Sequence, residues 1–247
     1  MLMINFFIIN DKLLYYYRDI DEATKVPLNA GEVILANCSH FIIQNLNIMD
    51  GDVGILLGFS SYNDISYNNI ANVIAGIWLT HSSYNAISNN IISNVGGGIP
   101  MTTSSNHNII SENIIADNWE YGIGLWASSY NTISDNTITN NQQAGIYLMI
   151  FSNLNTISKN VITNNWYGVY LSSSFISITR NNNFIGNHKH AFFENSIANF
   201  WLRNYWDDHI KFSPKVIDGT ITLPWNPSKT IDWKNFDWLP AHEPYEW

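Results

Sequence analysis

An isoleucine that recurs at nearly constant spacing is the feature that most constrains the fold of this 247-residue chain. The column contains Ile42, Ile65, Ile87, Ile110, Ile133, Ile157 and Ile178. An asparagine follows three residues later, at Asn45, Asn68, Asn90, Asn113, Asn136, Asn160 and Asn181. A third column is glycine, at Gly31, Gly54, Gly76, Gly98, Gly122, Gly145 and Gly168. Three concurrent columns indicate a tandem repeat of about 22–24 residues.

The residue types within the unit predict β-strands. Short runs of Ile, Thr, Val, Tyr and Trp alternate with polar residues, and Asn, Ser and Gly separate the runs. No stretch has apolar residues at helical spacing, which excludes a helical solenoid, and a leucine-rich repeat would need several leucines in each unit. We therefore predict an all-β chain folded as a single-stranded parallel β-helix.

Stacking explains most of the asparagines and glycines. In a parallel β-helix, equivalent residues of consecutive coils lie about 4.8 Å apart, so inward isoleucines form continuous ladders. Inward asparagines at the bends can bond the coils above and below, and glycine leaves room for the next coil. We expect these two residue types to serve the fold rather than a ligand.

Two of the clearest units resemble a known family. Residues 85–92 (NAISNNII) and 155–162 (NTISKNVI), each followed by Gly-Ile/Val-x-Leu or a close variant, resemble the NosD-type right-handed parallel β-helix repeat family. That family is grouped with carbohydrate-binding and sugar-hydrolase β-helices. Residues 204–208, 214–219 and 235–240 resemble the C-terminal cap of archaeal surface-protein members. The resemblance implies a right-handed solenoid with a C-terminal cap, in an extracellular, cell-surface or periplasmic location.

The repeat divides the chain into three segments. Residues 1–36 are expected to form a partial N-terminal coil plus an inserted segment, residues 37–200 the β-helix repeats, and residues 201–247 a Trp/Pro-rich cap whose tryptophans close the last coil. The apolar start has no basic region and no small-residue cleavage site, so no clear signal peptide is present. We expect upstream coils or another subunit at the open N-terminal end.

Charge limits the choice of partners. Eleven Lys and Arg residues stand against 20 Asp and Glu, and the net charge of −9 offers no basic surface for nucleic acid. Between Lys25 and Lys159 the sequence contains no Lys or Arg, so the body lacks a cationic clamp for an acidic polysaccharide. No apolar run reaches the roughly 18 residues of a membrane span. The single cysteine, Cys38, excludes an intramolecular disulfide framework. We expect no cofactor.

The first candidate site is an outward aromatic surface. In Gly-Ile-x-Leu the residue x points away from the core, which places Trp78, Tyr147 and Tyr170 in one outward column. Two positions further along, the next outward column contains Trp126, diagonally beside Tyr147. Flat rings on a rigid face suit stacking against sugars. Trp78, Trp126, Tyr147 and Tyr170 are the predicted carbohydrate-binding residues; the alternative is that they only favour strands or lie beneath a loop.

The second candidate is a pair of carboxylates. Glu112 and Asp135 precede successive ladder asparagines, so adjacent rungs place them near each other, as the two acids of a retaining glycosidase are placed. Lys159, one rung further on, would favour an ionised Asp135. A solvated charge ladder is the competing interpretation.

The third candidate is metal binding. His188 and His190 alternate along a predicted strand, which would put both imidazoles on one side and make them candidate metal ligands. Two histidines alone do not define a site, and the NosD resemblance adds the namesake's role in copper-site maturation. Asp207 and Asp208 are expected to bond turn amides in the cap.

Our preferred hypothesis is a secreted or cell-surface β-helix module that binds carbohydrate or a cell-surface polymer through its aromatic face and performs no chemistry by itself. The enzymatic alternative is a polysaccharide hydrolase, lyase or epimerase that uses Glu112 and Asp135. The third possibility is a structural or NosD-like copper-maturation scaffold.

Overall fold

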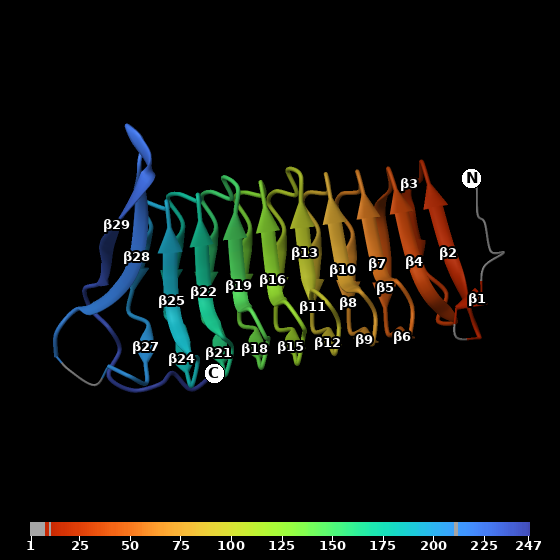
Figure 1. Ribbon diagram of the computed structural model, residues 1–247. Helices are drawn as coiled ribbons and strands as arrows, with labels where there is room; N and C mark the ends of the chain where they lie inside the picture. The colour runs from red at the N-terminus through yellow and green to blue at the C-terminus, as the bar shows by residue number, and fades with distance from the viewer. Residues whose placement is uncertain (1–7, 10, 210–211) are drawn as a thin grey trace.

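A computed structural model describes residues 8–9, 11–209 and 212–247 of the chain. Every regular element in these residues is a β-strand. The strands form parallel rungs that climb in one direction from the N-terminal end to the C-terminal hairpin (Figure 1). The predicted fold, a right-handed parallel β-helix, is confirmed. Part of the opening coil, residues 1–7, lies outside the described residues.

Each complete coil contributes one strand to each of three faces. The first face contains β2 (Lys12–Arg18), β4 (Ala30–Ala36), β7 (Val53–Gly58), β10 (Ala75–Thr80), β13 (Ile99–Thr102), β16 (Tyr121–Trp126), β19 (Ala144–Met149), β22 (Tyr167–Ser172) and β25 (Lys189–Glu194). The second contains β3 (Asp21–Lys25), β5 (Ser39–Gln44), β8 (Asp64–Ser66), β11 (Ala86–Ser88), β14 (Ile109–Ser111), β17 (Thr132–Ser134), β20 (Thr156–Ser158), β23 (Ile178–Arg180) and β26 (Phe200–Leu202). The third contains β6 (Asn47–Met49), β9 (Asn69–Ala71), β12 (Ile91–Ser93), β15 (Ile114–Ala116), β18 (Thr137–Thr139), β21 (Val161–Thr163), β24 (Asn183–Ile185) and β27 (Tyr205–Trp206).

The isoleucine column stacks as predicted in the middle of the solenoid and slips by one residue at both ends. Ile133 pairs with Ile110 below and Ile157 above, and all three are fully buried. Ile43 rather than Ile42 pairs with Ile65, and the buried Thr179 rather than Ile178 pairs with Ile157. The predictions for Ile42 and Ile178 are therefore wrong, because each has a neighbour that can also face inward. Burying each isoleucine stabilises the fold by roughly 1.5–3 kcal/mol relative to exposure.

The asparagine ladder satisfies backbone groups at the bend that follows the second face. Asn136 donates from Nδ2 to the carbonyl oxygens of Ile110 and Ser134 and to Oδ1 of Asn160, and its own Oδ1 accepts from Asn113. This chain of amides begins at Leu46 instead of Asn45 and continues through Asn182 instead of Asn181, which corrects the two end positions. The fold thus accounts for the buried asparagines, as expected.

The segment before residue 37 extends the solenoid. Strand β2 pairs in parallel with β4, and β3 pairs in parallel with β5. The short strand β1 (Ile8–Ile9) runs antiparallel to β2. Val33 pairs with Ile55, so Glu32 and not Gly31 precedes the column residue here, and the glycine column begins at Gly54.

A two-stranded hairpin closes the C-terminal end. Strands β28 (Lys215–Leu223) and β29 (Asn226–Asp237) pair with each other in antiparallel fashion and with β25 and β26 in parallel (Figure 1). Trp201 and Trp206 are buried under this end, whereas Trp225, Trp233 and Trp238 are exposed, so two of the cap tryptophans close the last coil. The fully buried Asp237 accepts the amide donors at the top of the asparagine ladder.

In the described part of the chain, no helix has the length and apolar character needed to cross a membrane.

Candidate functional site

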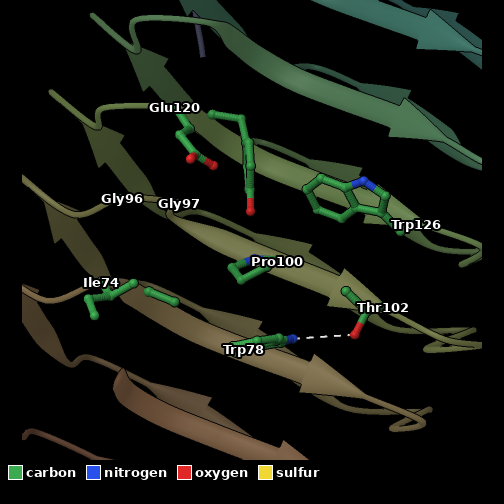
Figure 2. A pocket seen from close by; sticks show the side chains of 10 residues that line it. Ile74, Trp78, Gly96, Gly97, Pro100, Thr102, Glu120 and Trp126 are labelled. Carbon is green, nitrogen blue, oxygen red and sulfur yellow. Dashed lines mark hydrogen bonds between the residues drawn. The ribbon is translucent and has the colours of Figure 1, made fainter. Parts of the chain in front are cut away.

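A hollow of about 340 Å³, the first hollow, lies on the outer surface of the first face across β10, β13 and β16. Figure 2 shows the indole of Trp126 facing outward and that of Trp78 on edge, with Pro100 between them. The Trp78 indole N–H donates to Thr102 Oγ1 over 3.3 Å, which fixes the ring. The remaining lining includes Tyr121, Glu120 and small residues of the preceding turns. The hollow therefore has a mainly apolar floor and aromatic walls.

Two residues without side chains make room for the rings of the first hollow. A Cβ on Gly124 would lie 2.5 Å from the Trp126 indole and 2.7 Å from the Tyr121 ring, and a Cβ on Gly97 would lie 2.7 Å from the same tyrosine. Tyr121 and Trp126 meet edge to face, with centroids 4.9 Å apart and planes at 63°. Such a pair adds about 0.5–1.5 kcal/mol to the value of its buried area. The two rings pack against each other, and the absence of side chains at Gly97 and Gly124 lets them lie directly on the sheet.

A second hollow, of about 460 Å³, follows on the same face across β19 and β22. Its walls are Tyr147, Tyr167, Tyr170 and Trp166, and Gln142 and Gln143 supply amide groups. Tyr147 and Tyr170 lie on adjacent rungs with ring centroids 4.8 Å apart. The Tyr170 hydroxyl donates to Glu194 Oε2 over 2.8 Å.

Two phenols of the second hollow, those of Tyr147 and Tyr170, are shifted toward their neutral form. Burial, followed by the hydrogen bond to Glu194, raises the pKa of Tyr170, and burial also raises the pKa of Tyr147. The Tyr170 O–H is already donated to Glu194, so this oxygen can only accept from a ligand, whereas the neutral Tyr147 phenol can donate to a hydroxyl or carbonyl oxygen.

The four predicted carbohydrate-binding residues lie on one face. Trp78 and Trp126 line the first hollow, whereas Tyr147 and Tyr170 line the second. Trp126 and Tyr147 connect the two, with centroids 6.2 Å apart and planes at 60°. Trp78 is 37% exposed, and the other three are half-buried. We call this continuous surface, together with Tyr121 and Tyr167, the aromatic face.

A different exposed edge of the solenoid carries a stack of five aromatic rings from consecutive coils. His40, Tyr62, Tyr84, His107 and Tyr130 stack face to face, with centroids 4.9 to 6.0 Å apart and planes within 10° of parallel. Their faces contact one another, so a ligand would meet ring edges. Stacking on a sugar needs a free ring face, and the aromatic face offers that whereas this edge does not.

The predicted carboxylate pair is exposed at a bend. Glu112 and Asp135 adopt left-handed backbone conformations, with φ of 58° and 59°, on adjacent rungs. Both side chains are exposed, and neither lines the first or the second hollow. The two acids are adjacent, as the stacking predicts, but the aromatic face lies elsewhere.

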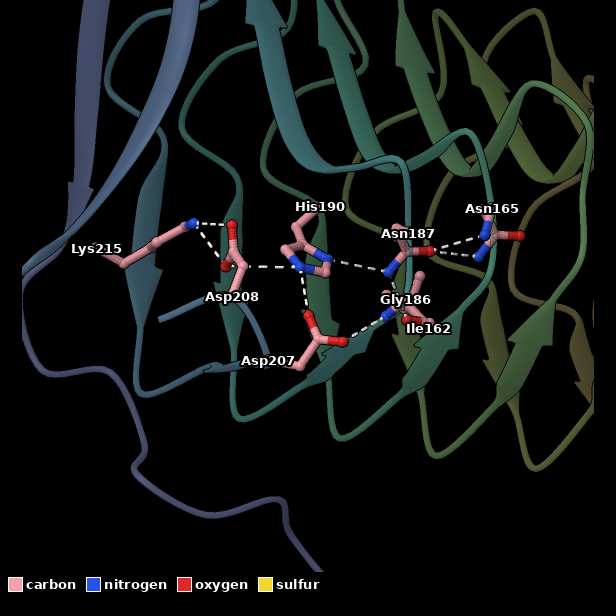
Figure 3. Close-up of polar contacts among 8 residues, drawn as sticks. All are labelled: Ile162, Asn165, Gly186, Asn187, His190, Asp207, Asp208 and Lys215. Carbon is pink, nitrogen blue, oxygen red and sulfur yellow. Dashed lines mark hydrogen bonds and ion pairs between the residues drawn. The ribbon is translucent and has the colours of Figure 1, made fainter. Parts of the chain in front are cut away.

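The two predicted metal-ligating histidines lie in different surroundings. His188 is exposed and stacks on Trp166 at 4.0 Å. His190, only 7% exposed, lies 2.7 Å from Asp207 Oδ1 and 3.5 Å from Asp208 Oδ1 through its Nε2 (Figure 3). Asp207 also accepts the Gly186 N–H, as expected for a turn amide.

Hydrogen bonds assign the proton of His190. Its Nδ1 lies 3.3 Å from Nδ2 of Asn187, whose amide also donates to Ile162 and accepts from Asn165. An NH₂ group can only donate, so Nδ1 accepts and Nε2 carries the proton toward Asp207. Burial lowers the pKa of His190 despite its two acidic neighbours. Residues Asp207, Asp208 and Lys215 share a polar cavity of about 360 Å³ with this neutral imidazole.

The sequence matches a described family over most of its length. The family described as "Periplasmic copper-binding protein (NosD)" matches residues 20–222. The chain belongs to the NosD family. A comparison with curated proteins finds none that matches.

Solved structures similar to this NosD-family chain are parallel β-helix proteins. Structures of the periplasmic alginate epimerase AlgG are at most 18% identical to this chain in sequence. One of them aligns with a TM-score of 0.52 and 17% identity, over 78% of this chain and 63% of that protein. A mutant of DFA-IIIase from Arthrobacter chlorophenolicus A6, in complex with DFA-III, aligns with a TM-score of 0.51 and 10% identity over 89% of this chain and 59% of that one. This chain spans less than two thirds of either protein's length, and the likeness is one of fold.

The family description names copper, and His190, which lies beside Asp207 and Asp208, does not fit such a site in its present hydrogen bonding. The Nε2 of His190, the nitrogen that faces Asp207 and Asp208, carries a proton because Nδ1 accepts from Asn187. Metal-binding histidines instead donate their other N–H to an acceptor. Lys215 Nζ contacts both oxygens of Asp208, at 2.7 and 2.6 Å, where a cation would sit. Lys215 therefore already compensates one of the two carboxylate charges of the cluster.

Sequence reasoning missed Tyr121 and Tyr167 of the aromatic face and Glu120 at the rim of the first hollow. Tyr121 precedes the glycine of its repeat, and its ring crosses to the outward side over Gly97 and Gly124. Glu120 comes next to it at the rim of the first hollow. The signal in the sequence that could have indicated this position of Tyr121 is the pair of glycines, Gly97 and Gly124, which leave space above the sheet.

Proposed function

We propose that this NosD-family chain binds a polysaccharide through its aromatic face. The observation that carries the proposal is the shared outward surface of Trp78, Trp126, Tyr147 and Tyr170, with two hollows along the solenoid axis. A polymer laid along this axis meets a ring or a hollow at successive rungs, which are about 4.8 Å apart. Apolar walls with few polar groups are typical of ligand sites.

Two further findings support a carbohydrate. The rings stand at 60° or 63° to their neighbours around Trp126, so the outward side of its indole remains available for stacking. Similar folds occur in AlgG, described as an alginate epimerase, and in DFA-IIIase, which was solved with DFA-III. We propose a periplasmic, extracellular or cell-surface location, consistent with the family description.

Glycan-array binding tests the proposal. The wild-type protein should bind at least one class of polysaccharide, and Trp126→Ala and Tyr147→Ala should each weaken that binding by about fivefold or more, because a stacked aromatic contributes about 1 kcal/mol or more. Tyr84→Ala, on the stacked edge, is the matched control and should leave binding unchanged. Unchanged binding in both face variants, or no binding by the wild type, would contradict the proposal.

Product release distinguishes binding from catalysis. Incubating the bound polysaccharide with the protein should leave its chain length and sugar composition unchanged. New products that disappear with Glu112→Gln would favour the enzymatic alternative, in which Glu112 and Asp135 act together.

A further inference from the structure

Among the described residues that line the first hollow, one is charged, namely Glu120. Glu120 lies at its rim, and its carboxylate points toward the space above Pro100 (Figure 2). Burial raises the pKa of the Tyr121 phenol, and the nearby Glu120 carboxylate raises it further. An acid and three aromatic rings, those of Trp78, Tyr121 and Trp126, therefore surround the same hollow.

The Glu120 carboxylate has no partner among the described residues. Its backbone N–H donates to Gly96 and its carbonyl oxygen accepts from Gln143, but its side chain makes neither a hydrogen bond nor an ion pair within that part of the chain. The sequence places no Lys or Arg between Lys25 and Lys159. A negative charge thus faces the hollow without a neutralising cation from this stretch.

These surroundings discriminate by charge. A uronate sugar would bring its carboxylate toward Glu120, and the repulsion would not be offset by a nearby cation. An ammonium group would form a charge-assisted hydrogen bond to the carboxylate and a cation–π contact with the rings. A neutral sugar would gain stacking alone.

We infer that the first hollow binds the ammonium-bearing unit of an amino-sugar polymer. The sugar ring would pack against the Trp126 indole while its protonated amine reached Glu120. This inference rests on the proposed function and adds the chemical class of the ligand. It also separates this chain from AlgG, whose description names alginate, an acidic polymer.

The test is calorimetric titration with three oligosaccharide sets of equal length: fully deacetylated chitosan oligomers, their N-acetylated counterparts, and alginate oligomers. The pH is chosen so that the free amine is protonated. Wild-type protein should bind the deacetylated set at least tenfold more tightly than the N-acetylated set, and the alginate set most weakly. Glu120→Gln should remove the preference for the amine. Glu112→Gln, which removes the same charge from an exposed bend away from the hollow, should retain it.

The remaining outcomes separate this inference from the proposed function. Equal affinity for deacetylated and N-acetylated oligomers, with both lost in Trp126→Ala, would overturn the amine inference and leave polysaccharide binding standing. A preference that Glu112→Gln and Glu120→Gln reduce equally would also overturn it, since net charge would then explain the effect. Tighter binding of alginate would contradict it outright. Absence of binding to any oligosaccharide would contradict both.

Discussion

Gly124 and Trp126 lie two positions apart on the same side of strand β16, and a Cβ on the glycine would lie 2.5 Å from the six-membered ring of the indole. The backbone of Gly124 does not have a positive φ, so alanine is acceptable to the main chain. The glycine therefore serves the position of the ring, and the ring forms a wall of the first hollow. This relationship links the repeat to the proposed site. The outward column that carries a side chain in Trp78 and Tyr147 has a glycine at position 124, and the Trp126 indole occupies the space above it.

Gly124→Ala should weaken glycan binding by about tenfold while leaving the fold intact, because the indole must move away from the new methyl group. Titration and thermal unfolding measure the two effects. Gly58→Ala is the matched control: it lies on the same face, and a Cβ there would have its nearest atoms at 3.8 and 3.9 Å. Equal effects of both substitutions would contradict the assigned role of Gly124.

Asp237→Asn should destabilise the C-terminal end by roughly 1–3 kcal/mol, the cost of leaving buried donors unsatisfied. The carboxylate of Asp237 accepts from the backbone N–H groups of Arg203, Asn204 and Leu239, from the Asn204 side chain and from the Trp206 indole. Replacing one oxygen with NH₂ would set a donor against donors.

Chemical denaturation measures this loss. Asp232→Asn in the same strand, at an exposed position, should change stability by less than about 0.5 kcal/mol. Equal stability of Asp237→Asn and wild type would mean that the carboxylate does not terminate the asparagine ladder as described.

The pH dependence of stability should contain a contribution from Glu32. Burial, and secondarily the Asp52 carboxylate, raise the pKa of Glu32 to about 7. Its side chain is 7% exposed. Between the unfolded value near 4.5 and about 7, the folded state binds more protons than the unfolded state, so stability falls as pH rises through this window.

Glu32→Gln removes this titration and should stabilise the protein by about 1–3 kcal/mol at pH 8 relative to wild type, with little difference near pH 4. Denaturation curves at pH 4, 6 and 8 measure the change. Glu22→Gln, at an exposed position, should leave the curve of stability against pH unchanged. Parallel pH profiles for wild type and Glu32→Gln would refute the assignment.

Cys38→Ser should fold normally, with a change in stability below about 1 kcal/mol. Cys38 begins a column of small inward residues: its N–H donates to Ser60 Oγ, and its Sγ contacts the Ala36 carbonyl oxygen as Ser60 Oγ contacts that of Gly58. Burial raises the pKa of the thiol, so a thiol reagent should react slowly until the protein unfolds. Rapid labelling of the folded protein would contradict this placement.

The middle of the solenoid was predictable because each coil repeats the chemistry of its neighbours. Ile133 and Asn136 have equivalents above and below, so their inward positions follow from spacing alone. At the ends this redundancy disappears. Ile42 and Ile43 are both apolar, and only the strand pairing of β5 with β8 selects Ile43. Register at an end depends on the coil beyond it, which periodicity does not specify.

The aromatic face was predictable only in part. Alternation along a strand places Trp78, Tyr147 and Tyr170 outward. Stacking makes Tyr147 and Tyr170 neighbours, whereas Pro100 and Gly124 separate Trp78 from Tyr147 in the same column. The Tyr121 ring lies over two glycines because of side-chain packing, and the periodicity of the sequence does not specify that packing. The contact of His190 with Asp207 depends on the path of the cap, where the repeat has ended.

The most direct test of carbohydrate binding is a crystal structure of the protein with the tightest-binding oligosaccharide. We predict sugar rings on the aromatic face, with one stacked on Trp126 and others continuing past Tyr147 along the solenoid axis. An oligosaccharide bound instead along the stacked edge of Tyr62, Tyr84 and Tyr130, with both hollows empty, would contradict the account.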